Sequence, residues 1–190
     1  TSETMLAVAT DRNAGRANVE FRVGDAVGLP IADASVDGVV AVQVYEYVPD
    51  VTAALAEAFR VMKPDGRLVV VDVDWSTVSW YSNKPERMEK MLSVWDQHLA
   101  HRALPQRLAH DLTTGGFIDV ETQGHAFVNT DNSLDGYSGA VIPLIADFAA
   151  ANNVSAKEAV SWSSELEELS RNGEYFFTVT KFVFNARRPA

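Results

Sequence analysis

The sequence contains no cysteine, no cluster of basic residues and no long apolar run. The lack of cysteine among 190 residues excludes disulfides, thiolate metal ligands and a cysteine nucleophile. With 16 Lys and Arg against 26 Asp and Glu, the formal net charge is -10, so we do not expect nucleic acid as a partner. No apolar run reaches the roughly 18 residues of a membrane span, so we expect no membrane partner and a cytoplasmic location.

Length and composition are those of one globular domain. Hydrophobic residues make up 47% of the chain and charged residues 22%, which is close to average globular usage. A chain of 190 residues is long enough to bury a sizeable core. We therefore expect a single domain over residues 1–190, with a helical insertion at about 131–174 that could act as a lid.

The first half of the chain alternates between helical and strand-like patterns. The expected elements are a helix over 3–14, strands over 18–23 and 36–44, a helix over 50–62 and a strand over 67–74. Asp50 is expected to cap the helix over 50–62, and Pro64 and Gly66 to end it. Strands that alternate with helices over short connections predict an α/β fold with a parallel sheet and helices on both faces.

The second half has longer helical stretches and two further strands. The expected elements are helices over 85–102 and 105–114, a strand over 117–129, the helical insertion and a last strand over 175–187. In α/β sheets, ligands bind beyond the carboxyl ends of the strands. The segments that deserve a search for site residues are therefore 24–29, 43–47 and 72–81.

Residues 24–74 carry several motifs in a fixed order. These are Gly24-Asp25-Ala26, Leu29-Pro30, Val36-Asp37 and the segment RVMKPDGR over 60–67. In order and spacing they resemble the class I S-adenosylmethionine-dependent methyltransferases, in particular the small-molecule branch that includes ubiquinone and menaquinone biosynthesis enzymes. The resemblance implies a Rossmann-like sheet that is mostly parallel with an antiparallel last strand, and S-adenosylmethionine as the cofactor.

The resemblance also implies the residues that would hold this cofactor. Asp25 follows a strand, where its carboxylate can accept a hydrogen bond from the adenine amino group while the Ala26 amide contacts the neighbouring ring nitrogen. Gln43 and Val44 would give backbone contacts to the methionine part. Tyr47 stands where family members commonly have His, and it cannot act as a base near neutral pH without a large pKa shift. We therefore assign no catalytic residue.

Two features of the family do not occur in this sequence. They are the glycine-rich turn after the first strand and the acidic residue that ends the second strand. The segment TSETML over 1–6 resembles the start of the helix that follows that residue. Since the family orders its strands 3-2-1-4-5-7-6, the strand over 18–23 would reach the strand over 36–44 only across two others. The resemblance therefore predicts that an upstream segment or a second chain completes the sheet.

Candidates for the methyl-acceptor pocket follow the strand over 67–74 and lie in the insertion. They are Asp74, Trp75, Trp80, Tyr81 and Tyr137. For the tryptophans, core packing is as good an explanation as substrate contact. His98 and His101 are one helical turn apart, but without a third ligand at suitable spacing a polar helix face explains them better than a metal site.

Two hypotheses about function remain open at this stage. The first is an enzyme that transfers a methyl group from S-adenosylmethionine to a small hydrophobic or aromatic molecule by in-line displacement. The second is a non-catalytic methyltransferase-like partner or regulatory subunit. Binding of S-adenosylhomocysteine would distinguish them.

Overall fold

Four strands form one sheet in the order β1-β2-β4-β3. The computed structural model describes residues 3–133 and 136–190. The strands are β1 (Val36–Val42), β2 (Met62–Trp80), β3 (Ile118–Asn129) and β4 (Phe177–Arg187). β1 and β2 are parallel, and β4 runs antiparallel to both β2 and β3.

The prediction of a mostly parallel sheet is wrong for the described residues. One strand pair of three is parallel, because only β1 and β2 are joined by a crossover helix, α2 (Val51–Val61). Antiparallel pairing of the last strand is confirmed, since β4 lies between β2 and β3 and opposes both. β1-β2-β4-β3 also corresponds to the 4-5-7-6 part of the strand order that the resemblance implied.

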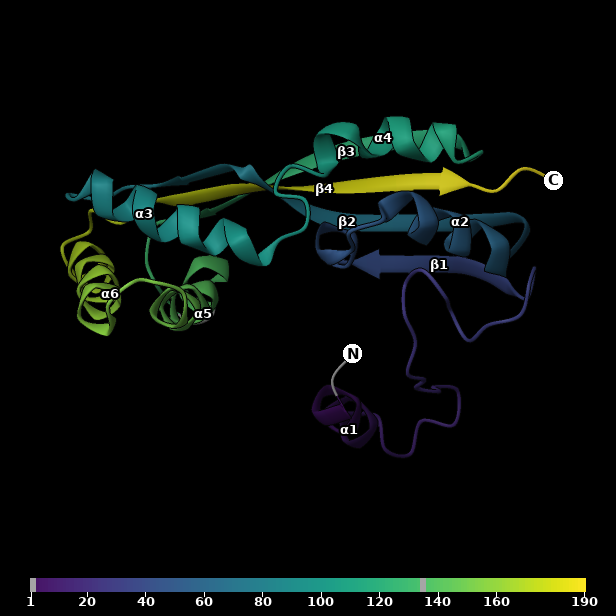
Figure 1. The fold of residues 1–190 in the computed structure, drawn as a ribbon, viewed down its shortest axis with the longest axis horizontal. Helices are drawn as coiled ribbons and strands as arrows, with labels where there is room; N and C mark the ends of the chain where they lie inside the picture. Colours follow the sequence, from purple (N-terminus) through teal and green to yellow (C-terminus); the bar gives the residue numbers. More distant parts are fainter. Residues whose placement is uncertain (1–2, 134–135) are drawn as a thin grey trace.

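The strand predicted over 18–23 is not formed. Val19, Phe21 and Val23 are exposed, and no strand of the described residues pairs with them. A strand requires a neighbour that takes up its backbone hydrogen bonds, so an alternating pattern alone does not produce one. The preceding helix, α1 (Glu3–Arg12), is formed but buries no residue, and Figure 1 shows it apart from the sheet. Thr1 and Ser2, which belong to the TSETML motif, lie outside the described residues.

α2 and α4 (Pro105–Thr114) cover one face of the sheet at the end near the C-terminus (Figure 1). Leu68 and Val70 of β2 point to this face and are buried against both helices. The Asp50 carboxylate accepts a hydrogen bond from the Ala53 amide (2.9 Å), which confirms the predicted cap of α2. The helix ends at Val61, just before the predicted stop at Pro64.

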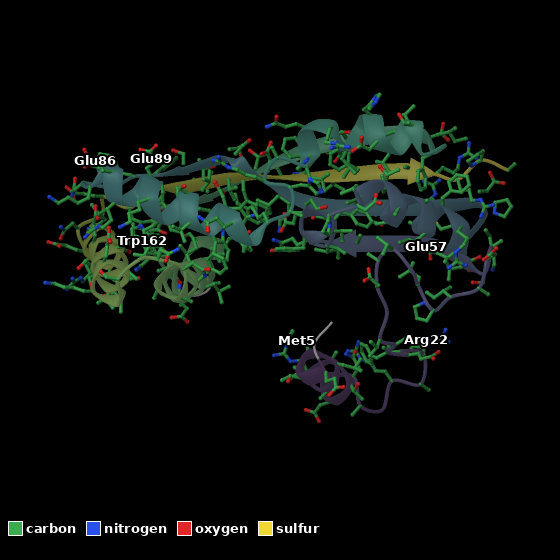
Figure 2. All side chains as sticks on the ribbon, viewed as in Figure 1. Met5, Arg22, Glu57, Glu86, Glu89 and Trp162 are labelled. Carbon is green, nitrogen blue, oxygen red and sulfur yellow. The ribbon has the colours of Figure 1, made fainter. Side chains whose placement is uncertain are left out.

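A second core occupies the opposite face at the other end of the sheet. There α3 (Pro85–Trp95), α5 (Tyr137–Ala151) and α6 (Ala156–Arg171) gather around Val73 and Trp75, which alternate with Leu68 and Val70 along β2. Trp162 of α6 is fully buried among these helices (Figure 2). Helices thus lie on both faces, as predicted, but each group covers a different half. The helix expected over 85–102 ends at Trp95, and a short 3-10 helix, Asp96–His98, follows it.

One part of the sheet has no cover within the described chain. Val40 and Val42 of β1 lie on the face away from α2 and are 69% and 53% exposed. Apolar side chains at strand positions normally face a packing layer. None of the described helices is both long and apolar enough to cross a membrane.

Candidate functional site

The carboxyl end of β1 turns sharply at Gln43. Its backbone adopts a positive φ of 50°, which is uncommon for a residue other than glycine, while its amide still donates to the Val71 carbonyl of β2 (2.7 Å). The Gln43 side chain reaches the Tyr137 hydroxyl at the start of α5, at 3.5 Å. The turn therefore brings the 43–47 segment next to the insertion.

Three of the predicted cofactor residues line one cavity. Asp25, Ala26 and Val44 belong to a cavity of about 770 Å³ between the 20–36 segment and the end of β1. This volume falls within the usual range for small-molecule pockets, about 300–1,000 Å³. The remaining wall of the cavity is mostly apolar. The other lining residues are Glu20, Arg22, Gly24, Leu29, Pro30, Ile31, Ala32, Ser35 and Val36. Gln43 and Tyr47 flank Val44 but do not line this cavity.

A tight turn presents Asp25 at the cavity. One carboxylate oxygen of Asp25 accepts from the Val27 amide (3.1 Å), and its carbonyl accepts from the Gly28 amide (3.0 Å). Gly24 has no room for a side chain, because a Cβ atom there would lie 2.6 Å from Cδ of Pro30. The Gly-Asp-Ala and Leu-Pro motifs are thus two sides of one folded loop.

Two buried carboxyl groups lie behind this strand end, and sequence reasoning missed both. Glu46 and Asp72 are fully buried. Burial, and then the neighbouring Glu46 charge, raise the pKa of Asp72 to about 7, although the backbone amides of Val44 and Glu46 act in the opposite direction. Burial likewise raises the pKa of Glu46. A signal was available, since Asp72 interrupts an apolar run that is predicted to be buried on both faces.

Tyr47 and the two histidines have separate surroundings. Burial and the adjacent Glu46 raise the pKa of Tyr47, which agrees with leaving it without a role as a base. Its ring lies 5.7 Å from that of His98, and burial lowers the pKa of His98. His101 instead contacts the carbonyls of Val48 and Pro49, both at 3.1 Å from Nε2. The described residues contain no group of three or more potential side-chain metal ligands.

The predicted acceptor residues are scattered rather than gathered. Trp75 and Trp80 are buried in the second core, and Tyr81 is half exposed with its hydroxyl donating to Asn83 (3.1 Å). Asp74 is buried and accepts hydrogen bonds from the Ser76 amide and the Gln106 side chain, both at 3.0 Å. Of the five, Tyr137 contacts the 43–47 segment through Gln43, and Trp75 interacts with the Glu46 carboxyl group of the same segment. Their contact with a substrate stays a prediction.

Comparison with known proteins finds a family model that matches the first part of the chain. Residues 1–70 match the family model described as a methyltransferase domain. The match includes the cavity-lining loop and the whole β1-α2 unit, and it ends inside β2.

Two curated relatives that match this chain are named as methyltransferases. The demethylmenaquinone methyltransferase of Lactococcus lactis is 30% identical over 141 residues, which are 65% of this chain and 56% of the relative. The ubiquinone/menaquinone biosynthesis C-methyltransferase of Rubrivivax gelatinosus is 39% identical over 80 residues, 42% of this chain and 30% of the relative. The chain thus spans about half, or less, of the length of these relatives.

The fold of the chain has a solved counterpart. The phosphoethanolamine N-methyltransferase 2 of Haemonchus contortus, solved with S-adenosyl-L-methionine, superposes with a TM-score of 0.57 at 20% identity. The superposition covers 98% of this chain and 41% of that one. At this identity the likeness concerns the fold, which is therefore an α/β methyltransferase fold with a mixed four-stranded sheet.

Proposed function

We propose that this protein transfers a methyl group from S-adenosylmethionine to a small hydrophobic or aromatic molecule. The observation that carries the proposal is the cavity shared by Asp25, Ala26 and Val44, in a segment that matches a methyltransferase family model. The family uses S-adenosylmethionine as its methyl donor, and the donor set of the cavity suits an adenine ring. A carboxylate and a backbone amide stand at one side, while Leu29, Ile31 and Val36 offer apolar walls.

The roles of the residues follow from their chemistry. The Asp25 carboxylate accepts a hydrogen bond from the amino group of the adenine, and the Ala26 amide donates to the adjacent ring nitrogen. Gln43 and Val44 contact the methionine part from the end of β1. Tyr47 and Tyr137 exclude water at the side where the acceptor enters, and α5 and α6 close that side as a lid.

Positioning is the main catalytic effect that these residues supply. When bound, S-adenosylmethionine provides the methyl group and a sulfonium leaving group that is already activated by its charge. The protein has to hold the acceptor in line with this group and keep water away, and such alignment lowers barriers by roughly 7–11 kcal/mol in favourable cases. No side chain is assigned as a base, because the pKa of Tyr47 is raised rather than lowered.

Titration calorimetry with S-adenosylhomocysteine tests the proposal. Asp25→Ala removes a charge-assisted hydrogen bond, which is typically worth roughly 1.5–3 kcal/mol, so we expect the affinity to fall about 10- to 100-fold. Asp147→Ala, an exposed aspartate on α5 outside the cavity, is the control and leaves the affinity unchanged. Wild-type protein that binds no S-adenosylhomocysteine contradicts the enzyme and favours the non-catalytic partner, whereas equal binding by Asp25→Ala contradicts the assigned site.

A further inference from the structure

Two arginines bind three successive carbonyl groups in the wall of the cavity. Arg60 of α2 donates to the Leu29 carbonyl through Nη2 (3.2 Å) and to the Ile31 carbonyl through Nη1 (3.0 Å). Arg22 donates to the carbonyl between them, that of Pro30, at 3.1 Å. All three carbonyl residues line the cavity together with Asp25 and Ala26. The shape of this wall is therefore fixed by guanidinium groups.

Glu57, one turn before Arg60 on α2, completes the attachment. Its carboxylate binds the Arg60 guanidinium at two points, Nε to Oε1 at 2.9 Å and Nη2 to Oε2 at 2.8 Å. The same Oε2 accepts from the Leu29 amide at 3.0 Å. Leu29 is thus held through its amide by Glu57 and through its carbonyl by Arg60. Paired charge-assisted hydrogen bonds of this kind fix orientation as well as distance.

The Arg60–Glu57 pair is better protected from water than the pair on the other side of the loop. The side chains of Arg60 and Glu57 are 32% and 18% exposed, against 52% and 69% for Arg22 and Glu20. Arg22 belongs to the segment that leads away from α1, and Glu57 to α2 beside the sheet (Figure 2). Exposed pairs contribute little because water and salt screen them. Arg60 and the Leu29 amide also hold the pKa of Glu57 near 2, so its carboxylate stays ionised throughout the physiological range.

Pro30 in the wall packs against Gly24, on the side of the loop that is proposed to bind adenine. Gly24, which precedes Asp25, lies so close to Pro30 that a Cβ atom could not be added without displacing the ring. The backbone beyond the wall is held as well, because the Ala34 amide donates to the Arg60 carbonyl (2.9 Å) and the Ser35 amide to the Val61 carbonyl (2.8 Å). Residues 29–31 therefore pack directly against the residue that precedes Asp25.

We propose that Arg60 and Glu57 are positioning residues for the cofactor, which act by holding the Leu29–Ile31 wall against α2. This rests on the proposed function, since it assumes that the cavity binds S-adenosylmethionine. α2 packs on the sheet through other residues, namely Val51, Ala54, Leu55 and Ala58. The helix can therefore remain in place when the wall is released.

Amide hydrogen exchange and calorimetry together test this proposal on the intact protein. Arg60→Met keeps the apolar stem of the side chain and removes all carbonyl contacts, while Arg60→Lys restores one donor. We expect the Leu29 amide to exchange at least about tenfold faster in Arg60→Met with the α2 amides unchanged, and the affinity for S-adenosylhomocysteine to fall about tenfold. Arg60→Lys should be intermediate in both. The matched control is Arg107→Ala, which breaks an ion pair with Asp111 on α4 and should change neither.

The outcomes separate this proposal from the proposed function. If the Leu29 amide of Arg60→Met exchanges as in wild type, Arg60 does not hold the Leu29–Ile31 wall. If it exchanges faster but the affinity for S-adenosylhomocysteine is unchanged, the positioning role is overturned. If the α2 amides also exchange faster in Arg60→Met, the Leu29 exchange rate and the S-adenosylhomocysteine affinity of Arg60→Lys decide instead. An Arg60→Lys variant that equals wild type in both then overturns the proposal. Wild-type protein that does not bind S-adenosylhomocysteine overturns the proposed function instead, and with it the cofactor role of these residues.

Discussion

Replacement of Asp72 by asparagine should remove a large part of the pH dependence of stability. Asp72 is fully buried on β2, and its carboxylate oxygens make no hydrogen bond of ordinary geometry within residues 3–133 and 136–190. Burial and the nearby Glu46 raise its pKa to about 7 from the ordinary value of 3.8. Between these two values the folded protein keeps a proton that the unfolded chain releases. The free energy of unfolding therefore falls as the pH rises through this window.

The magnitude follows from the two pKa values. A difference between 3.8 and about 7 corresponds to roughly 4 kcal/mol of stability lost in full above pH 7, at 1.36 kcal/mol per pH unit. About half of it, roughly 2 kcal/mol, is lost between about pH 5.5 and about pH 8.5. In Asp72→Asn this loss is absent. The amide adds its own unsatisfied donors, but that cost does not vary with pH.

Urea unfolding followed by tryptophan fluorescence measures the effect. The free energies of unfolding of wild type, Asp72→Asn and the exposed control Asp147→Asn are compared at the two pH values. We expect wild type and the control to lose roughly 2 kcal/mol more than Asp72→Asn between them. Equal pH dependence in all three proteins would refute the reasoning, because it would mean that the Asp72 carboxyl titrates as it does in water.

Two further predictions concern backbone positions. Gly24→Ala should weaken S-adenosylhomocysteine binding about tenfold, because the added Cβ displaces Pro30. The melting temperature should stay nearly constant, since this loop is exposed and lies outside the core. Unchanged affinity in calorimetry would contradict the loop geometry. Asp65 has a φ of 63°, so Asp65→Ala should be about 1 kcal/mol less stable in urea unfolding than Asp65→Gly. Both variants lose the Arg187 ion pair, so a glycine variant no more stable than the alanine variant would show that the backbone is unstrained.

Local patterns were sufficient to predict the β1-α2-β2 unit. The apolar spacing over 50–62, the Asp50 cap and the β-branched run over 36–44 are short-range properties of the chain, and the corresponding elements were formed. The motifs over 24–67 likewise pointed to the family that residues 1–70 match. They also gave the residues of the cofactor cavity, because Gly24-Asp25-Ala26 and Leu29-Pro30 are adjacent in sequence and fold onto each other.

Sequence patterns were insufficient where the structure of a segment depends on another element that pairs or packs with it. Residues 18–23 alternate like a strand but form none, since pairing needs a neighbour that the pattern does not supply. β2 continues past the end of β1 and pairs with β4 in the antiparallel direction. The sheet of the described residues is therefore mostly antiparallel. Trp75 and Trp80 were predicted to follow a strand that ends at residue 74, but β2 continues to Trp80 and helices from the insertion help to bury both side chains.

The sequence by itself pointed to the family model that residues 1–70 match and to the loop that carries Asp25, because both depend on residues that are close along the chain. Only the tertiary structure decided which charged side chains form strong interactions or have a shifted pKa. Arg60 reaches Leu29 and Ile31 across about thirty positions of sequence, and the burial that raises the pKa of Asp72 is supplied by surrounding elements. The strength of a charge depends on its distance to partners and on its exposure to water, and folding sets both.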